Sequence, residues 1–351
     1  MYPHIQRNCD FLGKLYRKEL SERPAWCVHP NQIGIFKWED GDYTLSQRPI
    51  ERWVPWVVEH YRHQVEWLEK LDDDSVPFAR LTTGTQIFAS AFGCEAHQFA
   101  DSNPCALPLV SSAQEADKIE EPDLWNCRGL MRVFELLRLV QRELGPEVFL
   151  GPCDLQSGFD TASLIWDKTD FYCALADPEE RQAVIRLAGK CARLFKKFIT
   201  ELRKEFPNLN PCHCPNVWAP PEMGPWLSND ECGVVSTLVF EEIMLPELVD
   251  LAETFGGLGM HCCAAAEHQF ASFKKIPNFY GFNRCKAQRG FTPIFEHLGG
   301  LEGPTHTLSW LAEEEIAELR AKAPAGTRFV FVWTGADIEE AKGWLERMRQ
   351  G

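Results

Sequence analysis

The chain lacks several features that would assign its class directly. It has no uninterrupted apolar run of the roughly 18 residues that a membrane-spanning helix needs, and residues 1–10 lack the charged-then-apolar order of a secretion signal. No repeat, low-complexity tract or linker is present, and no glycine-rich dinucleotide-binding loop opens the chain. These absences predict a cytoplasmic globular protein that is not embedded in a membrane.

The chain also has fewer positively charged than negatively charged residues. The 351 residues include 36 Lys and Arg against 51 Asp and Glu, a formal net charge of −15. A nucleic-acid-binding protein normally shows a basic field, so this balance argues against that class. The length suits one large domain or two modest ones. Without a linker, we expect a single domain over 1–351, with residues 1–75 as an irregular, partly helical N-terminal extension packed on it.

Fourteen cysteines are numerous, but nothing places the chain in an oxidising compartment. We therefore expect free thiols that pack as small hydrophobic groups. Cys212 and Cys214, in Pro-Cys-His-Cys-Pro, resemble a metal-binding motif. A second Cys or His pair at zinc-finger spacing is missing, which favours ordinary packing for both.

Helical periodicity alternates with short apolar segments along most of the chain. The helices are expected near 52–71, 128–144, 179–206, 240–255, 312–322 and 337–349, and the strands near 148–151, 216–218, 257–263, 278–282 and 328–333. Strands separated by long helices indicate parallel pairing through right-handed crossovers. The pattern predicts an α/β fold, a single (β/α)8 TIM-type barrel with an elaborated N-terminal segment. A doubly wound sheet is the alternative.

In a barrel, the chemistry belongs at the C-terminal ends of the strands. Eight candidate site residues follow from this rule or from their nearness to expected loops: Asp154, Gln156, Trp218, Asp230, His261, Cys263, Asn283 and Trp333. The two aspartates are the candidate catalytic groups, which would position or deprotonate a substrate. Gln156, Trp218, Asn283 and Trp333 are candidate substrate contacts.

His261 and Cys263 are the candidate metal ligands. In a strand, their spacing puts both side chains on one face. A neutral imidazole and a thiolate suit Zn²⁺ better than Mg²⁺ or Ca²⁺. Simpler roles remain open for these positions: a packed His and Cys, Asp154 as a helix cap, and Asp230 in a solvated loop.

Several segments, in this order, resemble the uroporphyrinogen decarboxylase superfamily. They are Phe92–Glu95, Gly151–Gln156, Ser228–Glu231, the Ser-rich helix start with Phe-x5-Pro over Ser236–Pro246, and the His-x-Cys at 261–263. The resemblance extends over roughly residues 76–349. It implies a (β/α)8 barrel of a superfamily that includes porphyrinogen decarboxylases and corrinoid-dependent methyltransferases.

The resemblance is nearer to the methyltransferase branch. The Arg-rich N-terminal motif by which the decarboxylases hold substrate carboxylates is absent, and only Arg48, Arg52 and Arg62 are scattered there. In the methyltransferases, His-x-Cys and a distant Cys near the last strand hold Zn²⁺. That zinc activates a thiol toward a methyl group carried by a corrinoid on a partner protein.

The resemblance leaves the third metal ligand unassigned, because residues 332–335 contain no cysteine. Cys232, Cys285 or Glu267 are the possible substitutes, unless the metal site has been lost. The leading hypothesis is therefore a methyltransferase that acts on a small molecule with a corrinoid protein. The alternatives are a cofactor-free decarboxylase of a porphyrinogen or another carboxylated substrate, and a non-catalytic ligand-binding barrel.

Overall fold

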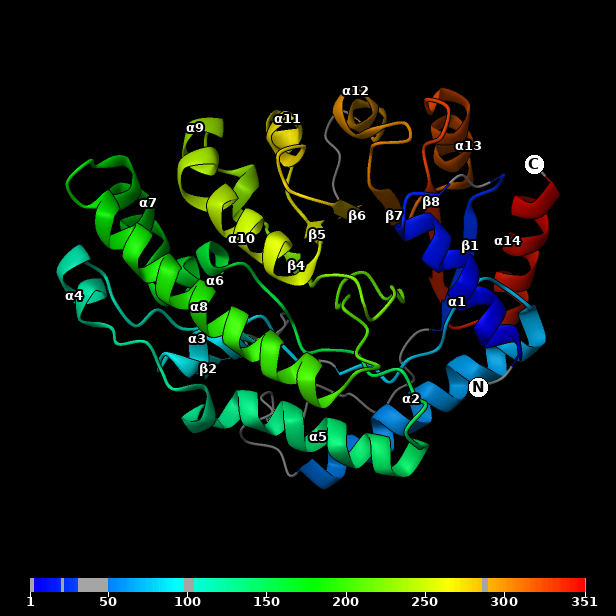
Figure 1. Cartoon of the computed structure of the whole chain (residues 1–351), viewed down its shortest axis with the longest axis horizontal. Helices are drawn as coiled ribbons and strands as arrows, with labels where there is room; N and C mark the ends of the chain where they lie inside the picture. Colours follow the sequence, from blue (N-terminus) through cyan, green and yellow to red (C-terminus); the bar gives the residue numbers. More distant parts are fainter. Residues whose placement is uncertain are drawn as a thin grey trace.

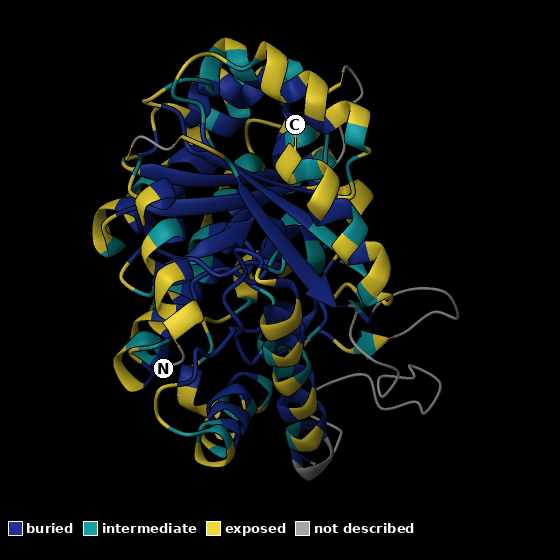
Figure 2. Ribbon diagram, turned by 90° about the vertical axis from the view of Figure 1, so that its right-hand side faces the viewer, coloured by how far each residue is buried: buried dark blue, intermediate teal, exposed yellow. Residues whose placement is uncertain are grey.

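The protein is a mixed α/β structure in which helices surround an arc of parallel strands (Figure 1). The computed structural model describes residues 3–19, 22–30, 50–81, 83–97, 104–285 and 290–350. The main sheet is buried except at the end of β8, where Trp333–Gly335 are half-buried, and the exposed surface belongs mainly to the helices and loops around it (Figure 2). Arg48, in the N-terminal region discussed above, lies outside the described residues.

The main sheet has six parallel strands in the order β1-β8-β7-β6-β5-β4. Their bounds are β1 Ala25–Pro30, β4 Trp226–Ser228, β5 Leu258–Cys262, β6 Phe279–Arg284, β7 Thr305–Ser309 and β8 Phe329–Gly335. A separate antiparallel pair comprises β2 Ala96–His97 and β3 Cys105–Ala106.

Helices of very different lengths connect and cover the strands. The α-helices are α1 Pro3–Tyr16, α2 Ile50–Leu71, α3 Ile87–Ala91, α4 Ala113–Lys118, α5 Arg128–Leu144, α6 Gly158–Ile165, α7 Lys168–Ala176, α8 Arg181–Glu205, α9 Thr237–Val239, α10 Leu245–Phe255, α11 Phe270–Phe273, α12 Phe295–Leu298, α13 Glu313–Lys322 and α14 Ile338–Gln350. Short 3-10 turns are η2 Leu124–Asn126, η3 Glu231–Gly233, η5 Glu267–Gln269 and η6 Thr292–Ile294, and η4 Phe240–Met244 is a π-helical turn.

The helices expected from periodicity are confirmed, with end shifts of a few residues and a π-helical turn at the start of the one near 240–255. The expected strand over 216–218 is wrong, because the strand in this region is β4, Trp226–Ser228. The short pair β2 and β3 was not predicted, nor were two further strands of the main sheet. β1 lies in the segment expected to be irregular and pairs with β8, and β7 lies between β6 and β8.

Beyond β4, the described chain continues the sheet as single parallel bridges instead of regular strands. Leu150 bridges both Ala79 and Leu209, and Cys212 bridges Trp226 of β4. Farther along, Gln156 bridges Ser228 directly. The expected strand over 148–151 is therefore a buried extended segment with one bridging residue, and regular strand pairing covers six strands of the described residues.

The bulky side chain of Trp226 explains why two positions in the neighbouring strands are glycine. Trp226 of β4 is fully buried and lies across Gly259 of β5 and Gly281 of β6, where an added Cβ would overlap its ring. Tyr16, at the end of α1, meets the rings of Trp226 and Tyr280 edge-on, with centroids 6.0 Å away in each case. Helix α1 therefore packs against the sheet at this point.

No helix in the described part of the chain is both long and apolar enough to cross a membrane.

Candidate functional site

His261, in strand β5, is held by a defined hydrogen-bond pair. Its Nδ1 lies 2.5 Å from Asn283 Oδ1, and the Asn283 amide donates to the Thr307 carbonyl at 2.6 Å. Because the amide nitrogen is committed to that carbonyl, Asn283 Oδ1 must accept, so Nδ1 of His261 carries the proton. In the neutral ring, Nε2 would carry the lone pair, and this atom faces Cys263, whose Sγ is 2.8 Å away.

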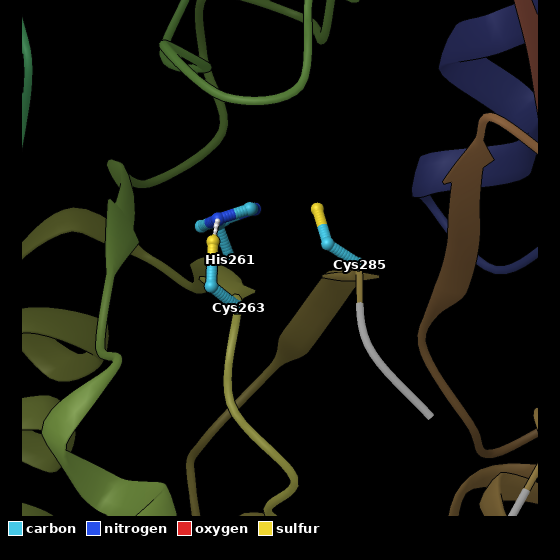
Figure 3. Close-up of side chains that lie close together, drawn as sticks. All are labelled: His261, Cys263 and Cys285. Atoms are coloured by element: carbon cyan, nitrogen blue, oxygen red, sulfur yellow. Dashed lines mark hydrogen bonds between the residues drawn. The ribbon is translucent and has the colours of Figure 1, made fainter. Parts of the chain in front are cut away.

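A third potential ligand comes from the end of the neighbouring strand. His261, Cys263 and Cys285 form a group whose donor atoms all lie within 4.8 Å of one another, and the three side chains converge in Figure 3. Cys285 directly follows β6, which pairs with β5. The carboxyl ends of adjacent parallel strands meet at one edge, which brings the residues together.

The other two possible third ligands face elsewhere. The Cys232 sulfur lies 3.6 Å from that of Cys262, a fully buried residue on the opposite face of β5 from His261. Glu267 forms an ion pair with Arg284 at 2.6 Å. Within the described residues, Cys285 is therefore the one of the three candidates that joins His261 and Cys263 in the group.

Asp230 supports the same strand end. Its Oδ1 accepts a hydrogen bond from the Cys263 backbone N–H at 2.5 Å. Asp160 in turn accepts from the backbone N–H groups of Asp230 at 2.6 Å and Glu231 at 3.2 Å. Hydrogen bonds thus tie the loop after β4 to α6 on one side and to Cys263 on the other. Asp230 is therefore held in place and does not lie in a freely solvated loop.

Asp154 lies close enough to Asp230 and His261 for their charges to affect its ionisation. Burial, and after it the negative charge of Asp230, raise its pKa to about 7 against the opposing effects of His261 and Arg80. One carboxylate oxygen, Oδ1, is buried without a hydrogen-bond partner. The cap of the following helix is Ser157, not Asp154, so the capping role is excluded. Asp154 can therefore exchange a proton near neutral pH.

Two predicted contacts, Gln156 and Asn283, belong to this group of residues. The Gln156 side chain hydrogen-bonds to Asp154, and its backbone bridges β4 at Ser228. Trp218 and Trp333 do not contact the group. Trp218 packs against Phe149, with ring centroids 5.3 Å apart. It lines a separate cavity of about 560 Å³ with Arg203 and others.

Trp333, near the end of β8, also lies apart. It stacks against Trp67 with ring centroids 6.4 Å apart. It lines a cavity of about 270 Å³ together with Trp310 and Trp344. The substrate contact expected for Trp333 therefore stays a prediction. A substrate that contacts Trp333 would lie in this second cavity, at the C-terminal ends of β7 and β8.

The sequence reasoning missed two residues of the site, His213 and Cys214. Burial and the nearby His261 lower the pKa of His213 to about 3, so its ring is neutral at physiological pH. Its Nδ1 donates to the Trp226 carbonyl at 3.1 Å, which leaves Nε2 to accept from the Ser228 hydroxyl at 3.1 Å. Asp154 Oδ2 is 4.0 Å from the same Nε2.

The two cysteines of the Pro-Cys-His-Cys-Pro segment have different surroundings. Cys212 is buried and donates to the Pro215 carbonyl, as a packed thiol does. Cys214 is half-buried, and its Sγ lies 3.4 Å from Nδ1 and 3.8 Å from Nε2 of His261. The motif itself was the available signal, but only the fold shows which of its two cysteines reaches the site.

The electrostatics reflect this concentration of thiols around one imidazole. Burial lowers the pKa of His261, but Cys214, Cys263 and Asp230 outweigh it and hold the pKa well above its usual value. The hydrogen bond with Cys285 raises the pKa of Cys263 well above that of an ordinary thiol. His261 and Cys263 therefore keep protons that a bound metal cation would displace.

No family model matches the chain, and no curated protein matches its sequence. Among solved structures, the chain is similar in fold to a methyltransferase from Methanosarcina mazei, with a TM-score of 0.64 and 12% sequence identity. The similarity covers 98% of this chain and 98% of that chain. At this identity, the likeness supports a shared fold along essentially the whole length.

Proposed function

We propose that the protein is a methyltransferase built on a variant (β/α)8 barrel, in which His261, Cys263 and Cys285 hold a metal ion that activates a substrate thiol. The proposal is carried by one observation: three soft or borderline donors converge at the carboxyl ends of β5 and β6. The full-length likeness to a methyltransferase structure supports it. The two extended segments around Ala79 and Leu150 would complete the barrel.

The donor set fits Zn²⁺. Catalytic zinc sites use three protein ligands and leave the fourth position for water or substrate. Asn283 fixes the His261 tautomer so that Nε2 is free to bind, and such outer partners are typical of histidine ligands. When bound, the zinc would lower the pKa of a coordinated thiol, so that a thiolate nucleophile forms at neutral pH.

The surrounding carboxyl groups would orient the reacting groups. Asp230 holds the Cys263 backbone, and through it the direction of the thiol. Asp154, with a pKa of about 7, would hold a proton at its carboxyl group and donate it in a hydrogen bond to the substrate. Gln156 would fix the position of that carboxyl group.

The methyl group would come from a corrinoid carried by a partner protein, as the resemblance of the sequence implies. A cofactor-free decarboxylase would need neither the metal nor the partner. A non-catalytic barrel would bind a ligand without turnover. The three hypotheses assign different roles to the cysteines, so substitution of the cysteines distinguishes them.

The test is metal content, followed by methyl transfer. Protein purified without an affinity tag should contain about one equivalent of zinc. Cys263→Ser and Cys285→Ser should lose it, whereas Cys173→Ser, at an exposed thiol on α7, should retain it. The zinc-loaded protein should demethylate methylcobalamin in the presence of 2-mercaptoethanol, and both ligand variants should be inactive.

Two outcomes would overturn the proposal. Wild-type protein that binds no zinc when it is supplied, or equal zinc binding by Cys263→Ser and wild type, would remove the metal site. Zinc binding without methyl transfer to any thiol, combined with carbon dioxide release from a carboxylated substrate, would favour the decarboxylase.

A further inference from the structure

The segment between α8 and β4 places a fourth donor beside the candidate metal ligands. Cys214 Sγ is 3.8 Å from His261 Nε2 and 3.4 Å from Nδ1. For a tetrahedral zinc with Zn–N of about 2.0 Å and Zn–S of about 2.3 Å, the N···S edge is roughly 3.5 Å. The observed Nε2···Sγ separation is a few tenths of an ångström longer, so the Cys214 sulfur lies next to a ligand position without occupying it.

The backbone on both sides of Cys214 is well fixed. His213 is anchored to the Trp226 carbonyl and the Ser228 hydroxyl. Asn210 donates to the Val217 carbonyl at 3.0 Å and accepts from the Ala219 N–H at 3.0 Å. The segment therefore presents the thiol of Cys214 from a rigid support, and the hydrogen-bond contacts of that thiol are to the His261 ring.

Cys214 lies outside the group formed by His261, Cys263 and Cys285, so its sulfur is beside the ligand set but not yet within it. Rotation of a cysteine about χ1 between staggered positions moves its sulfur by about 3 Å. Such a rotation is large enough to move the Cys214 sulfur from the edge of the imidazole to within bonding distance of an ion bound at Nε2.

We propose that Cys214 is an exchangeable fourth metal ligand, which closes the site at rest and leaves when the substrate thiol binds. This inference rests on the metal site of the proposed function. At rest, one imidazole and three thiolates would complete a closed four-coordinate site of the kind that excludes water. The position beside His261 described above is then the location of Cys214 after it has left.

The exchange balances without an external acid or base. With a metal ion held by His261, Cys263 and Cys285, the Cys214 sulfur would give up its place on the ion to the substrate sulfur. The proton that the substrate thiol loses would pass to the departing Cys214 thiolate. The number of metal–sulfur bonds and the net charge of the site remain constant, so substrate binding would release no proton to solvent from this step.

Cobalt(II) provides a direct test, because sulfur-to-cobalt charge-transfer absorption reports the number of bound thiolates. In cobalt-loaded Cys214→Ser, the band should lose roughly a third of its intensity, since three thiolates become two. Cys212→Ser is the matched control from the same segment and should leave the band unchanged. Addition of 2-mercaptoethanol should restore the band in Cys214→Ser and leave that of the wild type nearly constant.

A second measurement uses the wild-type chain and does not depend on the folding of a variant. Alkylation by iodoacetamide, mapped by mass spectrometry, should show that zinc protects Cys214 with the same midpoint as Cys263. The exposed Cys173 should react equally with and without zinc.

The outcomes separate the two proposals. If Cys263 is protected while Cys214 reacts at an unchanged rate, and Cys214→Ser has the wild-type cobalt spectrum, then Cys214 is not a ligand and the metal site stands. If neither cysteine is protected and the wild type gives no cobalt band, the metal site of the proposed function fails, and this inference fails with it.

Discussion

Asp154 gives the most quantitative prediction, because its ionisation is strongly coupled to folding. In the folded protein its pKa is about 7, against an ordinary value of 3.8 for an aspartate carboxyl group. In the unfolded chain it therefore ionises near pH 4, and in the folded protein near pH 7. Below pH 4 both states are protonated. As pH rises from 4 to 7, only the unfolded state releases the proton, so folding becomes progressively less favourable.

The size of this effect follows from the shift. About three pKa units at 1.36 kcal/mol each set an upper limit of about 4 kcal/mol. The side chain is 20% exposed, and hydration of the ionised form reduces the penalty. We therefore expect Asp154→Asn to gain about 2 to 4 kcal/mol of stability relative to wild type between about pH 5 and pH 8.

The assay is urea unfolding followed by tryptophan fluorescence, with both proteins measured at several pH values. The quantity of interest is how the stability difference changes with pH, because any constant effect of the amide then cancels. Asp117→Asn is the control: its hydrogen bond with Arg186 lowers its pKa, so it stays ionised over this range and its difference should be flat. A flat difference for Asp154→Asn as well would refute the reasoning, since Asp154 would then be ionised throughout.

Three further predictions concern packing, metal orientation and a buried ion pair. Gly281→Ala should lower the free energy of unfolding by about 1 to 3 kcal/mol, because the methyl group would overlap Trp226; unchanged urea stability would contradict this packing. Asn283→Ala should weaken zinc binding by about 10- to 100-fold in a chelator competition, since it releases the His261 ring; wild-type affinity would show that this hydrogen bond does not orient the ligand. Glu267→Gln should destabilise the fold by about 1 to 3 kcal/mol, because Arg284, only 1% exposed, would lose the negative charge of Glu267 while an amide oxygen remains to accept its hydrogen bond. A loss below about 1 kcal/mol in urea unfolding would mean that other groups compensate that charge.

The strand-end rule selected several residues that the structure brings together, without knowledge of contacts. It selected His261, Cys263 and Asn283 because they follow apolar segments that indeed form β5 and β6. Trp218 was selected next to an expected strand that is absent, and the structure places it in a separate cavity. The rule is therefore only as accurate as the strand to which it is applied.

There is a physical reason why strand β7 was not predicted. Strand β7, Thr-His-Thr-Leu-Ser, is fully buried yet largely polar. Its polar groups are satisfied internally: Thr305 donates to the Leu15 carbonyl, and His306 contacts the Leu298 carbonyl through Nε2 at 2.9 Å. Such partners come from distant parts of the chain, so hydropathy along the sequence could not reveal a buried strand here.

The long helices, the alternation typical of a parallel sheet, and the nearness of His261 and Cys263 at one strand end could be predicted from the chain alone. These are properties of neighbouring residues, since helical and strand periodicities depend on local geometry. The tertiary structure decided which other groups join that pair. Cys285 and Cys214 lie 22 and 49 residues away from Cys263 in the chain, counting from the printed sequence. They reach it because β6 pairs with β5 and because His213 anchors its segment to β4.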